Sequence, residues 1–166
     1  MISTAIQSQL PDNMKNQKGF TLIELLVVIG ILAILFSIVL IAINPSRQFG
    51  QANDTKKRSD TLQILNAIHE YAAEHGGALP TNMPAKSDTN PSVDITNAAG
   101  GANICADLMP TYISALPSNP SGASQGVPIT TCTTYDTSYN VSVDSAGRVT
   151  VSAGNDINGN PITITR

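Results

Sequence analysis

The chain has 166 residues and a formal net charge of −3 at pH 7. This length holds one long helix and one small domain of about 90 residues, and it excludes a second large core. From Ser59 onward, three basic residues (Lys86, Arg148 and Arg166) stand against nine acidic ones, so this part has a net charge of −6. A nucleic-acid-binding role for it is therefore disfavoured.

An uncharged apolar run extends from Leu25 to Ile43, directly after a single acidic residue, Glu24. A helix from Phe20 to Ile43 would be about 36 Å long at ~1.5 Å per residue, enough to span a bilayer core of ~30 Å. A carboxylate at mid-bilayer costs roughly 2.5–3.5 kcal/mol on insertion scales, and one near the helix start costs less. The sequence therefore predicts a membrane-spanning helix whose carboxylate needs a partner.

Two simpler interpretations compete with this one. An ordinary secretory signal would use Lys15 and Lys18 as its basic stretch, but the apolar run is long and no clear small-x-small cleavage site follows it. A plain membrane anchor would use Glu24 only to complement the positive end of its own helix. That second interpretation leaves the preceding Gly19-Phe20 pair unexplained.

The segment Lys18-Gly19-Phe20-Thr21-Leu22-Ile23-Glu24-Leu25-Leu26 closely resembles the class III signal of type IV pilins and of the pseudopilins of type II secretion. The resemblance implies that a prepilin peptidase cuts between Gly19 and Phe20 on the cytoplasmic side and N-methylates Phe20. It also implies that Glu24 meets the Phe20 amine of a neighbouring subunit in a helical filament. Each charge is costly in hydrocarbon, so such a pair would set the stagger of subunits as well as offset desolvation. Pairing with the chain's own Phe20 amine is the alternative.

The resemblance further implies a precursor in the inner or cytoplasmic membrane with its N-terminus in the cytoplasm, and then an extracellular surface filament or a periplasmic pseudopilus. The partners would be further copies of the chain, the peptidase and the pilus assembly machinery. Residues 1–19 would form the leader that is removed. Met14 is an alternative to Met1 as the true start, because Met14 to Gly19 alone would make a typical short leader.

After the apolar run, Asn44-Pro45 predicts a kink or a short unwound stretch, because proline removes a helical hydrogen bond and crowds the carbonyl of Ile41. Beyond it the pattern becomes that of an amphipathic helix ended by Gly76-Gly77. A basic cluster within this helix is expected to form a solvated face, with an Asp54–Arg58 pair, in preference to a lipid-headgroup contact. The cluster consists of Arg47, Lys56, Lys57 and Arg58, and the apolar stripe of Ile64, Leu65, Ile68, Tyr71 and Ala72.

The remainder predicts a connecting loop from Ala78 to Ala102 and then an antiparallel sheet. Ala106 to Pro120 is similar to a stretch of major pseudopilins and of many Gram-positive-type or environmental pilins, with Asn119 where an acidic residue is common. A fourth strand is expected around Val127 to Thr134. The other three are indicated by Tyr139, Val141 and Val143, by Val149, Val151 and Ala153, and by Ile162 and Ile164, with turns at Ser145-Ala146-Gly147 and Asn158-Gly159.

These elements together predict an α+β fold, the pilin fold, in which a long N-terminal helix packs its second half on the sheet. The expected divisions are a leader at 1–19, a transmembrane or filament-core helix at 20–45, an amphipathic helix at 46–75 and a globular head at 76–166.

Cys105 and Cys132 are the only two cysteines and lie in the part expected to be exported. A disulfide between them would close a loop of about 28 residues and stabilise the head by roughly 3–4 kcal/mol on the chain-entropy estimate. It would tie the first part of the head to the sheet. Free thiols are the alternative.

The oxygen-rich run from Asn155 to Asn160 superficially suggests a calcium loop, with Asp156, Asn158 and Asn160 as weak candidate ligands. It lacks the glycine and the glutamate that an EF-hand loop requires, so a hairpin turn is favoured. Major pseudopilins do carry a calcium site near their C-terminus, which keeps the alternative open. No other cofactor is expected.

His69 and His75 are accompanied by no nucleophile or carboxylate pattern typical of catalysis. The resemblance to type IV pilins implies a structural subunit of a type IV pilus, and no enzymatic activity is expected. A major pseudopilin of a type II secretion system is the alternative, and a membrane-anchored exported enzyme or binding protein is a remote one.

Overall fold

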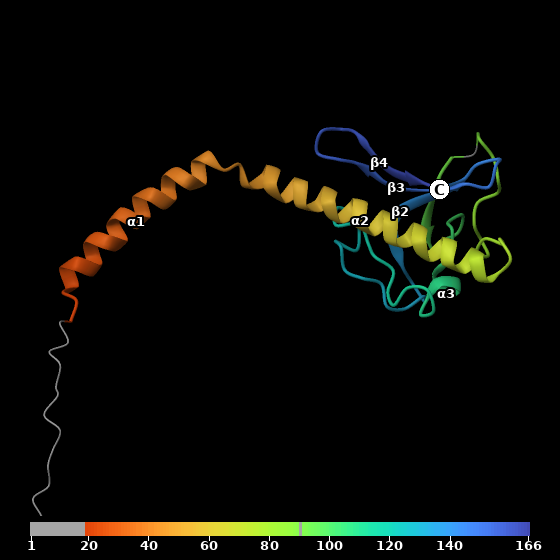
Figure 1. The fold of residues 1–166 in the computed structure, drawn as a ribbon, viewed down its shortest axis with the longest axis horizontal. Helices are drawn as coiled ribbons and strands as arrows, with labels where there is room; N and C mark the ends of the chain where they lie inside the picture. Colours follow the sequence, from red (N-terminus) through yellow and green to blue (C-terminus); the bar gives the residue numbers. More distant parts are fainter. Residues whose placement is uncertain (1–18, 90) are drawn as a thin grey trace, which may run out of the picture. The chain divides into compact units, whose positions relative to one another are not determined.

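The computed structural model describes residues 19–89 and 91–166. The leader positions Met1, Met14, Lys15 and Lys18 lie outside the described residues, so the predictions about them stay predictions. The chain divides into two compact units, residues 1–44 and residues 45–166, each of which is described by itself. Figure 1 shows the order of the helices and strands.

The described part of the first unit, residues 19–44, contains one helix, α1 (Leu22–Ala42). Its 21 residues correspond to about 31 Å, and none of them is buried. Ser37 donates its hydroxyl hydrogen to the carbonyl of Ala33 at 2.8 Å, which satisfies that hydroxyl within the helix. By length and composition α1 is able to cross a membrane.

The helical conformation is interrupted between the two units. Ile43 has an extended backbone, although its N–H still donates to the carbonyl of Val39 at 3.0 Å. Asn44 is also outside a helix, and Pro45 is the first residue of the next one. Proline is tolerated at that position because the first N–H of a helix has no intrahelical partner.

The second unit begins with α2 (Pro45–Glu74), which lies along the sheet (Figure 1). Three residues of its apolar stripe, Ile64, Leu65 and Ile68, have no exposed surface, and Tyr71 and Ala72 are partly buried. The helix stops where Gly76 and Gly77 adopt positive φ angles of 65° and 90°, a conformation that glycine adopts readily. The N–H of Gly77 then donates to the carbonyl of Ala72 at 2.7 Å.

The sheet is antiparallel and has the strand order β1-β2-β3-β4. The registers place Val141 opposite Val151 and Val151 opposite Ile164, so alternate apolar side chains lie on one face. The strands are β1 (Val93–Thr96), β2 (Asp136–Val143), β3 (Val149–Asn155) and β4 (Pro161–Thr165). The architecture is therefore α+β and consistent with the pilin fold, as the sequence predicts.

The predicted position of the fourth strand is wrong. Residues 127–134 form only an isolated bridge, Leu116 to Ile129, and the fourth strand is instead β1, inside the segment predicted to be a loop. Pro128 has no N–H to donate to a ladder, which disfavours a strand there. β1 is held by long-range bonds, such as that from the Thr96 hydroxyl to the Tyr135 carbonyl at 2.7 Å.

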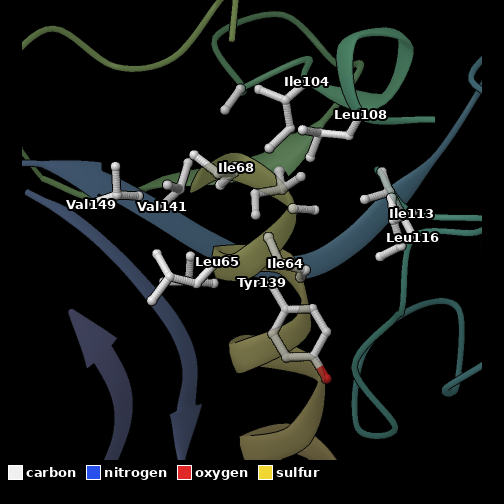
Figure 2. Packing of buried hydrophobic residues seen from close by; sticks show 14 of the residues in the cluster. Ile64, Leu65, Ile68, Ile104, Leu108, Ile113, Leu116, Tyr139, Val141 and Val149 are labelled. Atoms are coloured by element: carbon white, nitrogen blue, oxygen red, sulfur yellow. The ribbon is translucent and has the colours of Figure 1, made fainter. Parts of the chain in front are cut away.

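The core lies between α2, the concave side of the sheet and the segment around the short helix α3 (Cys105–Leu108) (Figure 2). Complete burial of a Val, Leu, Ile or Phe side chain contributes roughly 1.5–3 kcal/mol through the hydrophobic effect. The fully buried residues shown in Figure 2 include Ile64, Leu65, Ile68, Ile104, Leu108, Leu116, Tyr139, Val141 and Val149.

Candidate functional site

The start of α1 is organised by a reciprocal capping box between Thr21 and Glu24. The backbone N–H and the hydroxyl of Thr21 donate to Glu24 Oε2 at 2.7 and 2.8 Å, and the N–H of Glu24 donates back to Thr21 Oγ1 at 3.3 Å. Such a box satisfies N–H groups that have no partner in the first turn of a helix. The Glu24 carboxylate, for which the sequence predicts the need of a partner, thus has one in Thr21 of its own chain.

Sequence reasoning missed Thr21, although the Thr-x-x-Glu spacing that marks a capping box was readable. The hydrogen bonds that reach the carboxylate all end on Oε2. Within residues 19–89 and 91–166, Oε1 has no hydrogen-bond partner. One oxygen of Glu24 therefore remains able to accept a bond from outside the chain.

The surface around Glu24 is apolar and open. Phe20 is 85% exposed and lines a shallow hollow together with Ile23 and Val27, beside the carboxylate. Exposure of the Phe20 side chain to water is unfavourable, and its burial would be stabilising. The hollow therefore suits the apolar surface of another helix or of lipid. The site therefore places the Glu24 carboxylate, with one oxygen unpaired in the described chain, beside exposed apolar side chains.

The prediction of a solvated basic face on α2 is confirmed for Arg47 and Arg58, which are exposed, but it is wrong for Lys57 and for the Asp54–Arg58 pair. Lys57 is buried, and its Nζ donates to the backbone carbonyl of Asn155 at 3.1 Å. Arg58 lies 3.6 Å from Asp156 and not in the predicted pair with Asp54. The cause is that the turn between β3 and β4 folds onto this part of α2, which local sequence patterns do not reveal.

That turn is also held by carboxylates. Asp54 Oδ2 accepts a hydrogen bond from the N–H of Ile157 at 2.9 Å. Asp156 Oδ1 accepts from the N–H groups of Asn160 and Asn158 at 2.9 and 2.8 Å, and these bonds lower the pKa of Asp156.

The weak calcium candidates Asp156, Asn158 and Asn160 all lie on this turn. The Asp156 carboxylate is engaged there by backbone N–H groups and by Arg58, a donor set that suits a closed turn. The described residues contain no group of three or more His, Cys, Asp or Glu side chains able to hold a metal ion. Calcium binding at this turn stays a prediction.

A second charged cluster lies in the middle of α2. Asp60 Oδ2 accepts from Lys56 Nζ at 2.6 Å and from the hydroxyl of Tyr139, on β2, at 2.8 Å. Burial and the hydrogen bond to Asp60 both raise the pKa of Tyr139. The cluster ties helix to sheet with each polar group satisfied.

The remaining candidates have structural surroundings. Cys105 and Cys132 form a disulfide, with their Cα atoms 5.6 Å apart, so the predicted pairing is confirmed. His75 stacks on Tyr71 with ring centroids 3.9 Å apart and contacts the Tyr71 carbonyl. Within the described part of the chain, His69 Nε2 is buried without a hydrogen-bond partner. Neither histidine is hydrogen-bonded to a nucleophile or a carboxylate in that part.

An exposed apolar helix with a carboxylate at its start, followed by a small α+β head, is consistent with a membrane-anchored precursor. The family model of the prokaryotic N-terminal methylation motif matches residues 14–40. This is the class III signal of type IV pilins and pseudopilins, and it supports membership of that group, whose members are structural proteins, and a membrane-anchored precursor. Searches among curated proteins and among solved structures found no match.

Proposed function

We propose that this protein is a structural subunit of a type IV pilus, assembled by packing α1 against the α1 helices of neighbouring copies. The observation that carries the proposal is that every residue of α1 is exposed while Glu24, at its start, keeps one carboxylate oxygen without a partner in the described chain. The methylation motif over the same segment supports processing by a prepilin peptidase.

The proposed assembly contact joins Glu24 to the N-terminal amine of a neighbour. Cleavage between Gly19 and Phe20 would create an ammonium group on Phe20, and Thr21 would remain to hold Oε2. Oε1 would then accept from the ammonium of the next subunit. A carboxylate and an ammonium in hydrocarbon each carry a cost of several kcal/mol, so the pair favours only the registers that bring them together.

The experiment separates the charge of Glu24 from its capping role. Glu24→Gln removes the charge but keeps a side chain that completes a capping box, whereas Thr21→Ala removes the box and keeps the carboxylate. Electron microscopy of sheared cells counts filaments, and mass spectrometry of the subunit checks cleavage at Gly19. We expect Glu24→Gln to be cleaved normally and to lose filaments, and Thr21→Ala to keep most of them.

Filaments of normal number and length from the Glu24→Gln variant would contradict the pairing. A high-resolution image of the native filament would identify the partner directly, since a bond from Glu24 to its own Phe20 amine is the competing arrangement. A pseudopilin would give a different result. The parent strain would show no surface fibre, and cells that lack the gene would retain proteins that the parent strain secretes.

A further inference from the structure

The end of the head at which α2 begins carries exposed apolar side chains beside a basic one. Phe49 is 71% exposed and Ile157, in the β3–β4 turn, is 42% exposed. Ile157 lies directly against Gly50, and it lines a surface hollow together with Arg47. Phe49 does not line this hollow but lies at the same end of α2, one residue before Gly50. We call the three exposed residues at this end, Arg47, Phe49 and Ile157, the near-end patch.

The position of Ile157 is fixed by bonds between its turn and α2. The N–H of Ile157 donates to Asp54, Lys57 donates to the carbonyl of Asn155, and Arg58 pairs with Asp156. In Figure 1 the β3–β4 turn accordingly reaches toward the same end of α2 that begins at Pro45. An apolar side chain is thus held at this end of the head and remains 42% exposed.

The length of chain between α1 and the patch is short. α1 ends at Ala42 and α2 begins at Pro45, so these three steps span at most ~10 Å of extended chain. The four helical steps from Pro45 to Phe49 add about 6 Å. Whatever the orientation of the head, Phe49 therefore stays within about 16 Å of the end of α1. The headgroup layer that covers a bilayer core is about 5–8 Å thick on each side.

The formal charges of the head differ between its two ends. Residues 45–60 and the β3–β4 turn contain four basic residues (Arg47, Lys56, Lys57, Arg58) and three acidic ones (Asp54, Asp60, Asp156). The opposite end, around the C-terminus of α2 and the β2–β3 turn, contains five acidic residues (Glu70, Glu74, Asp88, Asp107, Asp144) and two basic ones (Lys86, Arg148). An anionic surface would attract the first end and repel the second.

We propose that the near-end patch docks the head onto the anionic lipid headgroups of the membrane that α1 spans. Phe49 and Ile157 enter the interface between headgroups and acyl chains, where aromatic and apolar side chains of peripheral segments gain from burial. Arg47 contacts lipid phosphate. The proposal rests on α1 spanning the membrane, and it does not depend on filament assembly.

The chain contains no Trp, so a single introduced Trp reports on one position alone. Phe49→Trp and Ile157→Trp probe the patch. Leu62→Trp is the matched control, because Leu62 is another exposed apolar residue of α2 and lies 13 residues, or about 20 Å, farther along the helix than Phe49. Each full-length variant is reconstituted into phosphatidylcholine vesicles with and without phosphatidylglycerol, and quenching by brominated lipid is measured.

Docking predicts strong quenching of Trp at positions 49 and 157, greater in the anionic vesicles, and little quenching at position 62. Adding Arg47→Gln should lower the ratio of docked to undocked heads about fivefold, because one basic residue near an anionic surface contributes ~1 kcal/mol. Phe49→Trp provides this charge comparison even if Ile157→Trp weakens the turn.

Three results would overturn the proposal. Failure of the chain to resist alkaline extraction would show that α1 does not span the bilayer, and the anchor itself would be wrong. An inserted chain in which position 157 is quenched no more than position 62 would exclude docking alone. Quenching that follows the protein-to-lipid ratio and ignores lipid charge would show that a second copy covers the patch.

Discussion

The two units of this chain use the same apolar residue types in opposite ways. In α1 no Ile, Leu or Val is buried, whereas in the head the side chains of Ile64, Leu65 and Ile68 are completely covered. Burial of apolar surface contributes roughly 25 cal/mol per Å², and the chain supplies that burial only for the head. The head therefore has its own folding core, whereas α1 buries none of its residues within the described chain.

The largest expected effect tests that division directly. Ile68→Ala should lower the free energy of unfolding of the head by about 4 kcal/mol, within a range of 2–5, because it opens a cavity in a close-packed core. Leu32→Ala, the same kind of truncation in α1, should leave head stability unchanged. Denaturation in detergent micelles measures both, and the four Tyr residues, which all follow Ser59 in the chain, report on the head alone. A comparable loss from Leu32→Ala would show that α1 belongs to the same cooperative unit.

The disulfide gives the next largest effect. Cys132→Ser, or reduction of the native protein, should cost about 3–4 kcal/mol, because the bond closes a long loop in the unfolded chain. The same denaturation assay measures it. Insertion of α1 into vesicles should not change, and a reduced chain that unfolds at the same denaturant concentration as the oxidised one would contradict the prediction.

The sequence predicted those features that rest on local patterns. The apolar stripe of α2 and strands β2 to β4 have clear periodicity, with alternating burial over the eight residues of β2 and the first five of β3. β1 is only four residues long, too short for an alternation to stand out from a loop. The capping role of Thr21 could have been predicted from its spacing to Glu24. The apolar run after Glu24 instead suggested a partner outside the chain.

The contacts between α2 and the β3–β4 turn could not be predicted from the sequence for a different reason. Lys57 meets Asn155 across 98 residues, and Asp54 meets Ile157 across 103. Neither partner is set by helical spacing, so the local rule suggested a pair within α2 that does not form. Long-range contacts of this kind follow from the sheet register and the length of the β3–β4 turn.

A smaller effect concerns the polar contact between helix and sheet. Tyr139→Phe should cost about 1.5–3 kcal/mol at neutral pH, because it removes a buried hydrogen bond to a charged group, Asp60. Folding raises the pKa of Tyr139 above its usual value of 10.0, so its contribution is complete below pH 10 and is lost as the pH rises further.

Denaturation of both proteins between pH 7 and pH 12 tests this prediction. Stability of the variant should fall less steeply above pH 10 than that of the parent chain. Some fall should remain, because hydrogen bonding to Glu74 raises the pKa of Tyr112 to about 12. Parallel curves for the two proteins would contradict the assignment of Tyr139.

The smallest effect compares two turns of the same sheet. Asp144 and Asp156 each accept hydrogen bonds from backbone N–H groups within a turn, and these bonds lower both pKa values. Their ion-pair partners differ. Asp144 pairs with Arg148 of its own turn, and Asp156 pairs with Arg58 of α2. Because folding lowers these pKa values, the contacts stabilise above the unfolded value, near 4, and are lost as the pH falls below it.

Asp156→Asn should therefore speed amide hydrogen exchange both in the β3–β4 turn and along α2 near Arg58, while Asp144→Asn should speed it only in the β2–β3 turn. Acidification of the parent chain should reproduce the first pattern, since protonation of Asp156 removes the same charge. Unchanged exchange along α2 in the Asp156→Asn variant would mean that the turn is held by Asp54 and Lys57 without the ion pair. In that case the bonds from Asp54 and Lys57 to the backbone of the turn, and not the Arg58–Asp156 ion pair, would fix the apolar side chain of Ile157 at this end of the head.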